Sequence, residues 1–121
     1  MQTVDNYESK IWLGLRAGYG HMYSNIADVS KVISEWCKEK KQCVTVSNTD
    51  FIYVDGWEPG LIIGFINYPR YPNSKAELKN RTLELAELLM KKFNQYRVSC
   101  TFYPTVPGGT VMLENKEMSD D

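Results

Sequence analysis

The fold is decided by the stretch LIIGFINYPRYPNSKAEL, residues 61–78, which passes from a strand through a loop into a helix. Residues 61–67 form an aliphatic run of the length and composition that a buried strand needs. Pro69 and Pro72 prevent regular structure over the residues that follow. Ser74 and Glu77 have the Ser-x-x-Glu spacing of a capping box, which marks the first turn of a helix. This stretch therefore predicts a strand, a short loop and a helix beginning near residue 75.

The residues that follow complete a strand-helix-strand-strand unit. Apolar side chains recur at helical spacing and predict one buried helix face: Leu78, Thr82, Leu85, Ala86, Leu89 and Phe93. Residues 97–103 then alternate between apolar and polar side chains, as a half-buried strand does. Pro107-Gly108-Gly109 turns the chain into a last strand over residues 110–114.

The first half of the chain repeats this order of elements. It contains a strand over residues 11–16, a loop over 17–24, a helix over 26–37 capped by Asn25, and two short strands over 42–47 and 51–54. Asn48-Thr49-Asp50 is interpreted as the turn between the short strands, and Asp55-Gly56 and Pro59-Gly60 as chain breaks. Ser24 and Ser74 precede the two helices at the same offset. A true duplication and a shared element order without duplication both remain open.

The predicted fold class is α+β, with a mainly antiparallel sheet and two helices on one of its faces. Six strands and two helices make two β-α-β-β halves, over residues 10–56 and 60–114. A chain of 121 residues is expected to be a single domain over 1–121. Its acidic end, residues 115–121, is expected to be frayed.

Composition excludes several classes of function. The formal charge of −1 provides no basic field that would hold a long nucleic acid through its phosphates. The sequence begins without the apolar run of a signal peptide, and no apolar stretch approaches the ~20 residues of a membrane span. Three cysteines, an odd number without metal-ligand spacing, favour a reducing compartment. The expected location is therefore the cytoplasm.

No familiar catalytic or metal-binding motif is complete in this sequence. His21 is the only histidine, no Cys-x-x-Cys pair is present, and neither a Gly-x-Ser-x-Gly elbow nor a phosphate-binding glycine motif occurs. We therefore expect no catalytic residue, no metal and no cofactor, and predict that the protein is not an enzyme.

Two loops interleave arginine with tyrosine, and each leads into the start of a helix. Arginine suits phosphate, and tyrosine offers a face on which a base can stack. The predicted ligand-binding residues of these loops are Arg16, Tyr19, His21 and Tyr23, followed by Asn67, Arg70 and Tyr71. The alternative is that the prolines stiffen a loop and the tyrosines pack over the edge of the core. His21 is either a ligand contact or an ordinary loop histidine.

One face of the sheet is expected to lie away from the helices. Strand alternation places Trp12 and Arg97 on it, and both are added to the predicted ligand-binding residues. This face is either solvated or a surface for a ligand or a second subunit. The second alternative is favoured because large aromatic side chains are seldom fully exposed to water. A homo-oligomer, a dimer or larger, is therefore expected.

Three short stretches, at residues 12–19, 66–72 and 94–98, resemble a family of phage proteins, the Thoeris anti-defence sponges. The resemblance implies a protein that binds cyclic ADP-ribose isomers made by host immune enzymes and sequesters them without degrading them. It also implies a homo-oligomer with pockets at or near subunit boundaries.

Three hypotheses on function follow. The first is a binder of a cyclic nucleotide that acts against host defence. The second is a phage inhibitor that acts by contact with a host defence protein. The third is an enzyme of unrecognised type that uses His21 with a carboxylate such as Asp50 or Asp55.

Overall fold

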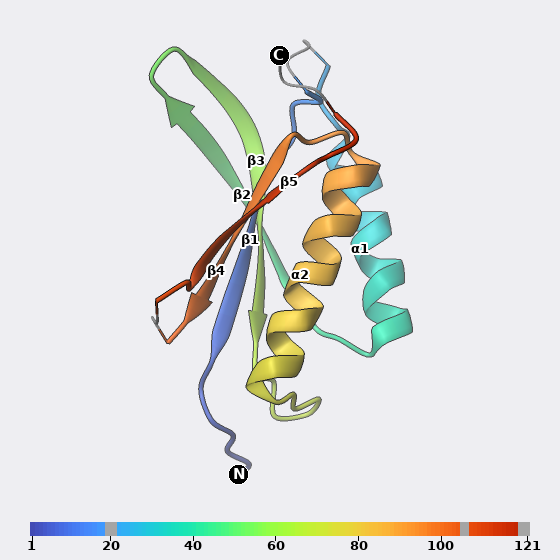
Figure 1. The fold of residues 1–121 in the computed structure, drawn as a ribbon. Helices are drawn as coiled ribbons and strands as arrows, with labels where there is room; N and C mark the ends of the chain where they lie inside the picture. The colour runs from blue at the N-terminus through green and yellow to red at the C-terminus, as the bar shows by residue number, and fades with distance from the viewer. Residues whose placement is uncertain (19–21, 105–106, 119–121) are drawn as a thin grey trace.

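The computed structural model describes residues 1–18, 22–104 and 107–118 (Figure 1). In these residues the chain forms five strands and two helices: β1 (Glu8–Gly14), α1 (Ile26–Lys40), β2 (Thr45–Tyr53), β3 (Gly56–Ile66), α2 (Lys75–Lys92), β4 (Arg97–Tyr103) and β5 (Thr110–Glu114). Neither of these helices is long and apolar enough to cross a membrane.

The strands form one antiparallel sheet in the order β2-β3-β1-β4-β5. Both helices cover the same face of this sheet, and the other face has no helix over it (Figure 1). The first six elements follow the split β-α-β arrangement of ferredoxin-like folds, and β5 extends the sheet beyond β4. The predicted α+β class, antiparallel sheet and shared helix face are confirmed.

Both helices begin where the sequence indicates. The Asn25 side chain accepts a hydrogen bond from the backbone N–H of Ala27 at 2.8 Å, and so caps α1. Ser74 and Glu77 form the predicted capping box at the start of α2, with reciprocal bonds of 3.1 and 3.0 Å. α1 ends at Lys40 and is followed by the C-cap residue Lys41, whose left-handed backbone has φ of 55°.

The predicted hairpin over residues 42–54 is wrong, because residues 45–53 of this stretch form one continuous strand, β2. Asn48, Thr49 and Asp50 pair along β3 with Leu61, Gly60 and Pro59 and do not turn. The turn lies instead at residues 54–55, so the structure has five strands where the sequence predicts six. Turn-favouring residues remain extended here because cross-strand contacts outweigh their weak strand propensity.

The sequence predicts a chain break at Pro59-Gly60. In the structure these two residues lie inside β3. Gly60 is required there by its neighbours. A Cβ atom at this position would lie 2.2 Å from the Phe51 ring and 2.7 Å from the backbone oxygen of Leu13. Gly60 therefore leaves room for an aromatic ring to cross the sheet surface.

The core lies between the helix-facing side of the sheet and the two helices. Alternate residues of β1 and β3 point into it, among them Ile11, Leu13 and Phe65, none more than 1% exposed. The Phe65 ring meets Trp36 of α1 edge to face at 6.1 Å. The predicted alternation of inner and outer side chains along β1 is confirmed.

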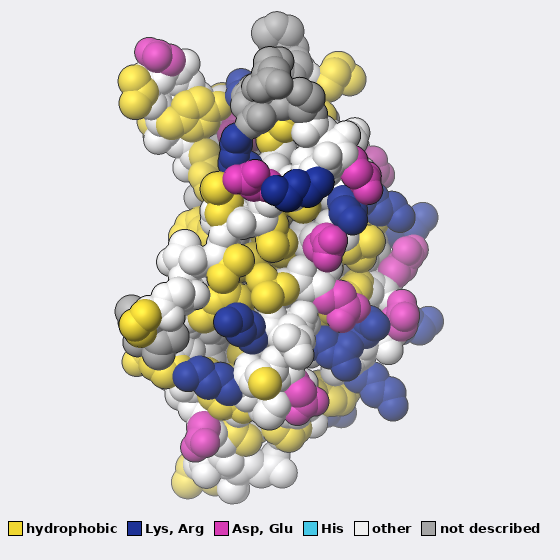
Figure 2. Space-filling model, in the orientation of Figure 1, with side chains coloured by type: hydrophobic (Ala, Val, Ile, Leu, Met, Phe, Trp, Pro, Cys, Tyr) yellow, Lys and Arg dark blue, Asp and Glu magenta, His cyan; other side chains and the backbone are white. Residues whose placement is uncertain are grey.

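Hydrophobic side chains are exposed at the tip of the β2–β3 hairpin, which projects from the body of the molecule (Figures 1 and 2). Ile52 is 81% exposed and Val54 is 97% exposed, and Trp57 lies on the returning strand beside them. The helices present both positive and negative side chains over much of their outer surface (Figure 2). The hairpin tip is therefore an exposed apolar surface.

The three cysteines are free and differ in reactivity. Burial raises the pKa of Cys100 to about 12, and it raises the pKa of Cys37 to a lesser extent, with a smaller effect of Cys43. We expect an alkylating reagent at pH 8 to modify exposed Cys43 first, Cys37 more slowly, and Cys100 only after unfolding. Peptide mass spectrometry against time measures the order. Early modification of Cys100 would contradict the packing of β4 against α2.

Candidate functional site

The first predicted loop meets the β2–β3 hairpin at one end of the sheet. Five side chains gather there, which we name the Glu58 cluster: Arg16, Tyr23, Trp57, Glu58 and Gln95. They come from the loop after β1, from β3 and from the turn between α2 and β4. Forty-two positions separate Arg16 from Glu58, so no local motif reveals the cluster.

The loop over residues 15–24 is closed by its own backbone. Arg16 and Tyr23 form an antiparallel bridge, and the N–H of Ala17 donates to the carbonyl of Met22 at 2.9 Å. The N–H of Leu15 donates to the carbonyl of Pro59 at 3.0 Å, which ties the loop to β3. Arg16 and Tyr23 are therefore held beside each other, as two of the residues predicted for the ligand site.

Two side-chain oxygens lie over Gly14, the last residue of β1. A Cβ atom at Gly14 would be 2.7 Å from Oε2 of Glu58 and 3.1 Å from Oε1 of Gln95. The same Glu58 oxygen accepts a hydrogen bond from the N–H of Arg16 at 3.1 Å, and Gln95 donates to the Arg16 carbonyl at 2.7 Å. The absence of a side chain at Gly14 thus creates a place where two acceptor oxygens converge.

Two half-exposed aromatic rings border these oxygens. The rings of Tyr23 and Trp57 lie 6.5 Å apart at 51°, and about half of each side chain is accessible. The indole N–H of Trp57 donates to the Asp50 carboxylate at 3.0 Å, which fixes the ring. Fixed, partly exposed aromatic faces can accept a flat base or a cation.

The Arg16 side chain adds a positive group to the cluster. Its Nε is buried and has no hydrogen-bond partner among the described residues. A buried N–H without a partner is costly, so the Arg16 guanidinium group retains an unused donor. Acceptor oxygens, aromatic rings and a guanidinium together suit a ligand that carries a positive group, a negative group and a flat apolar part.

The second predicted loop lies at the opposite end of the sheet, because β1 and β3 run antiparallel and each loop follows the end of its strand. Asn67 is buried and structural: it donates to the Asp5 carbonyl at 2.9 Å and accepts from the N–H of Asn73 at 3.0 Å. Arg70 lies 5.9 Å from the centre of the Tyr71 ring. One chain therefore does not bring the two arginine-tyrosine loops together.

The remaining predicted ligand residues are spread over the sheet. Trp12 lies on the outer face of β1, where its N–H donates to Thr101 at 3.1 Å and Lys10 lies 5.9 Å from its ring. Arg97 is at the start of β4, in register with Glu114. Tyr19 and His21 lie outside the described residues. In the described part of the chain, no three His, Cys, Asp or Glu side chains gather into a possible metal site.

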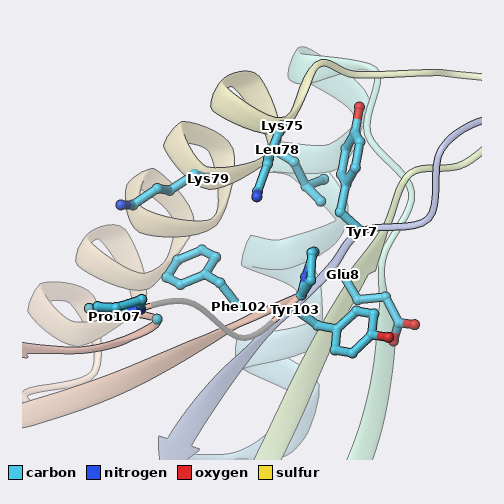
Figure 3. Close-up of a pocket in the computed structure, with 11 residues that line it drawn as sticks. Tyr7, Glu8, Lys75, Leu78, Lys79, Phe102, Tyr103 and Pro107 are labelled. Carbon is cyan, nitrogen blue, oxygen red and sulfur yellow. The ribbon is translucent and has the colours of Figure 1, made fainter.

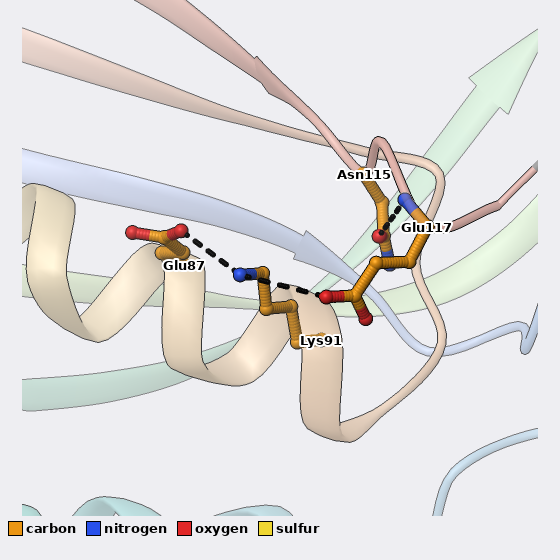
Figure 4. Close-up of polar contacts among 4 residues, drawn as sticks. All are labelled: Glu87, Lys91, Asn115 and Glu117. Atoms are coloured by element: carbon orange, nitrogen blue, oxygen red, sulfur yellow. Dashed lines mark hydrogen bonds and ion pairs between the residues drawn. The ribbon is translucent and has the colours of Figure 1, made fainter.

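The C-terminal segment, residues 115–118, contacts α2 and the loop that contributes Arg16 and Tyr23 to the Glu58 cluster. The Lys91 ammonium lies 3.2 Å from Glu87 and 3.9 Å from Glu117, and Asn115 accepts from the N–H of Glu117 at 3.1 Å (Figure 4). Met118 follows, and its terminal carbon lies 3.6 Å from the position that a Cβ on Gly18 would take. Residues 115–118 are thus packed against α2 and the first loop.

Comparison with known proteins identifies the fold. No protein-family model matches the chain, and no curated protein does. Two solved structures match it along nearly their whole length, both of a phage SAM lyase. The apo structure is 18% identical, with 93% of this chain and 92% of that chain covered and a TM-score of 0.75. The complex with S-methyl-5′-thioadenosine is 17% identical, with 98% and 97% covered and a TM-score of 0.78.

These comparisons correct two predictions. Both neighbours are phage proteins, as the resemblance implied, but they are a SAM lyase and not a Thoeris sponge. The prediction that the chain is not an enzyme is overturned, because an enzyme is built on the same fold. The absence of a familiar catalytic motif therefore does not exclude catalysis here. The chain shares its fold with phage SAM lyase over almost all of its residues.

Proposed function

We propose that this protein is a lyase that cleaves S-adenosylmethionine (SAM) and releases S-methyl-5′-thioadenosine. The observation that carries the proposal is the fold shared with a phage SAM lyase over 98% of the chain, in a structure that holds this nucleoside. We place the site at the Glu58 cluster, whose chemistry fits SAM. We further propose that a phage uses the activity against host defence, in the cytoplasm of the infected bacterium.

The Glu58 cluster offers a partner for each part of SAM. Its sulfonium and α-ammonium groups are positive, and the oxygens of Glu58 and Gln95 over Gly14 can accept such groups. The Arg16 guanidinium group can donate to the substrate carboxylate, a charge-assisted bond. Tyr23 and Trp57 provide faces on which adenine can stack or a sulfonium can rest.

The bond to be broken follows from the two molecules. S-methyl-5′-thioadenosine is SAM without its four-carbon amino-acid group, so the bond between the sulfur and the γ carbon must break. The sulfur keeps the electron pair and becomes a neutral thioether. The γ carbon then bonds to an oxygen of the substrate's own carboxylate and closes a lactone ring, so neither water nor a protein nucleophile is consumed. Two opposite charges disappear, a change that surroundings less polar than bulk water favour.

The test is to incubate the purified protein with SAM and to separate the products by chromatography. We expect S-methyl-5′-thioadenosine to accumulate with time and with protein concentration. No accumulation, under conditions where the protein is folded, would contradict the proposal.

A cyclic ADP-ribose isomer remains a second candidate ligand. Such a molecule carries phosphates, which the Glu58 carboxylate repels, but the second loop offers Arg70 beside the stacked rings of Tyr68 and Tyr71, 6.3 Å apart. Retention of a cyclic ADP-ribose isomer by the protein, together with no cleavage of SAM, would favour this ligand.

We also propose that the protein is a homo-oligomer assembled through the β2–β3 hairpin. Exposed apolar side chains at its tip, Ile52 and Val54, have no partner surface within the described residues of one chain. Exposed apolar groups gathered on a projecting element are typical of an interface.

We expect the parent protein to have a mass of at least two 14.0 kDa chains, and the double variant Ile52→Glu/Val54→Glu to have the mass of one. A charge at each tip position would be costly to bury in an interface but leaves the single chain unstrained. Light scattering measures both masses. Leu88→Glu, at a partly exposed position on α2, is the control and should leave the mass unchanged. A monomeric parent would instead favour the hypothesis of an inhibitor that contacts a host protein.

A further inference from the structure

A cavity lies beside the start of β1, at the end of the sheet opposite the Glu58 cluster (Figure 3). It is bounded by the start of α2, the start of β1, the end of β4 and residues 107–109. Its volume is about 110 Å³. This is well below the roughly 300 Å³ at which pockets for drug-sized ligands begin, so the cavity suits a ligand smaller than a nucleoside.

The walls of this cavity are mainly apolar. Leu78 points from α2 toward the sheet, and Phe102 of β4 lies below it (Figure 3). Tyr7 forms another wall, and its hydroxyl donates to the carbonyl of Asn73, so the ring is fixed. Pro104 and Pro107 add rigid surface. These walls suit a flat or compact hydrocarbon group.

Two lysines provide the charge of the cavity. Lys75 and Lys79 are four residues apart on α2 and so lie on the same side of the helix, where like charges repel each other. Lys79 Nζ lies 5.7 Å from the centre of the Phe102 ring. Among the residues that the structure describes, neither ammonium has an ion-pair partner.

The one carboxylate of the cavity lining does not neutralise these lysines. Glu8 extends away from α2 (Figure 3), and it is in register with Tyr103 on the outer face of the sheet. The side of the cavity next to the helix is therefore positive and the rest of its lining is mostly apolar. A ligand complementary to this lining carries a negative group beside a hydrocarbon body.

We propose that this cavity is a second binding site, which takes a small organic acid whose carboxylate lies between Lys75 and Lys79. Its apolar body fills the space among Leu78, Phe102 and Tyr7. The site is independent of the proposed lyase activity, because it shares no residue with the Glu58 cluster and lies at the other end of the sheet.

The test uses benzoate as the probe and benzamide, an uncharged analogue of similar shape, as the control. Titrations are followed by the backbone NMR signals of the protein, including those of Lys79, Gly108 and Gly109. We expect benzoate to shift these signals with saturation in the millimolar range, and benzamide to bind at least about tenfold more weakly, since it lacks the charge-assisted contact.

The double variant Lys75→Met/Lys79→Met keeps the apolar stems and removes both charges. We expect it to bind benzoate at least about tenfold more weakly than the parent. Lys92→Met, at the far end of the same helix, should bind benzoate like the parent. The proposal is overturned if benzoate does not shift these signals, if benzamide binds equally well, or if the double variant binds like the parent. SAM cleavage by the double variant should be unchanged, which separates this site from the proposed function.

Discussion

Replacing Glu58 with glutamine is expected to lower the rate of SAM cleavage by about 10²–10³-fold, the range for loss of one preorganised electrostatic contact. Glutamine keeps the shape of the side chain and an oxygen that can accept from the N–H of Arg16. It removes the negative charge that we assign to the positive groups of the substrate. The rate of S-methyl-5′-thioadenosine release, measured by chromatography, provides the comparison.

Two further variants make this experiment specific. Gly14→Ala would place a Cβ atom 2.7 Å from Oε2 of Glu58, so the carboxylate must move and activity should fall although the charge remains. Glu87→Gln removes an exposed carboxylate that is paired with Lys91 on α2, and should leave the rate unchanged. If Glu58→Gln cleaves SAM at the parent rate, the Glu58 cluster is not the site.

Replacing Phe65 with alanine is expected to cost about 3–5 kcal/mol of the free energy of unfolding, the usual range for a buried phenylalanine. Phe65 is the largest fully buried side chain and packs against Trp36, so its loss leaves a cavity where the sheet meets α1. A domain of this size is stable by about 5–15 kcal/mol, so the variant should be partly unfolded or close to it. Urea unfolding followed by circular dichroism measures the change.

Leu88→Ala is the matched control, because Leu88 is more than a third exposed and alanine favours the helix. Its free energy of unfolding should change by less than about 1 kcal/mol. A Phe65→Ala protein as stable as this control would show that the core does not depend on the contact between β3 and α1.

Local sequence patterns predicted some features of the fold correctly and others wrongly. Helix caps at Asn25 and Ser74 and the alternation along β1 were predictable, because each depends on atoms within a few residues. The continuity of β2 was not predictable from Asn48-Thr49-Asp50, whose local preference is a turn. Pairing with β3 and the room that Gly60 gives the Phe51 ring decide it.

Some residues of the candidate site were predicted from the sequence, and others were not. Arg16 and Tyr23 were predicted and lie together, since their bridge is local to one loop. Glu58 and Gln95 were missed as site residues, because the contacts that bring them to Arg16 span 42 and 79 positions of the sequence. The two arginine-tyrosine loops lie at opposite ends of the sheet, because β1 and β3 are antiparallel and each loop follows the end of its strand.

Local sequence patterns predict the α+β class, the starts of both helices and the inner and outer faces of the strands, because the signals for these features act over one turn or one alternation. The same patterns do not specify the number of strands, the convergence of Glu58 and Gln95 over Gly14 beside Arg16, or the separation of the two loops. These features depend on contacts between residues tens of positions apart, whose pairing no short stretch of sequence specifies. The fold, shared with a phage SAM lyase, is also the reason why we propose an enzyme where the sequence predicted a binder.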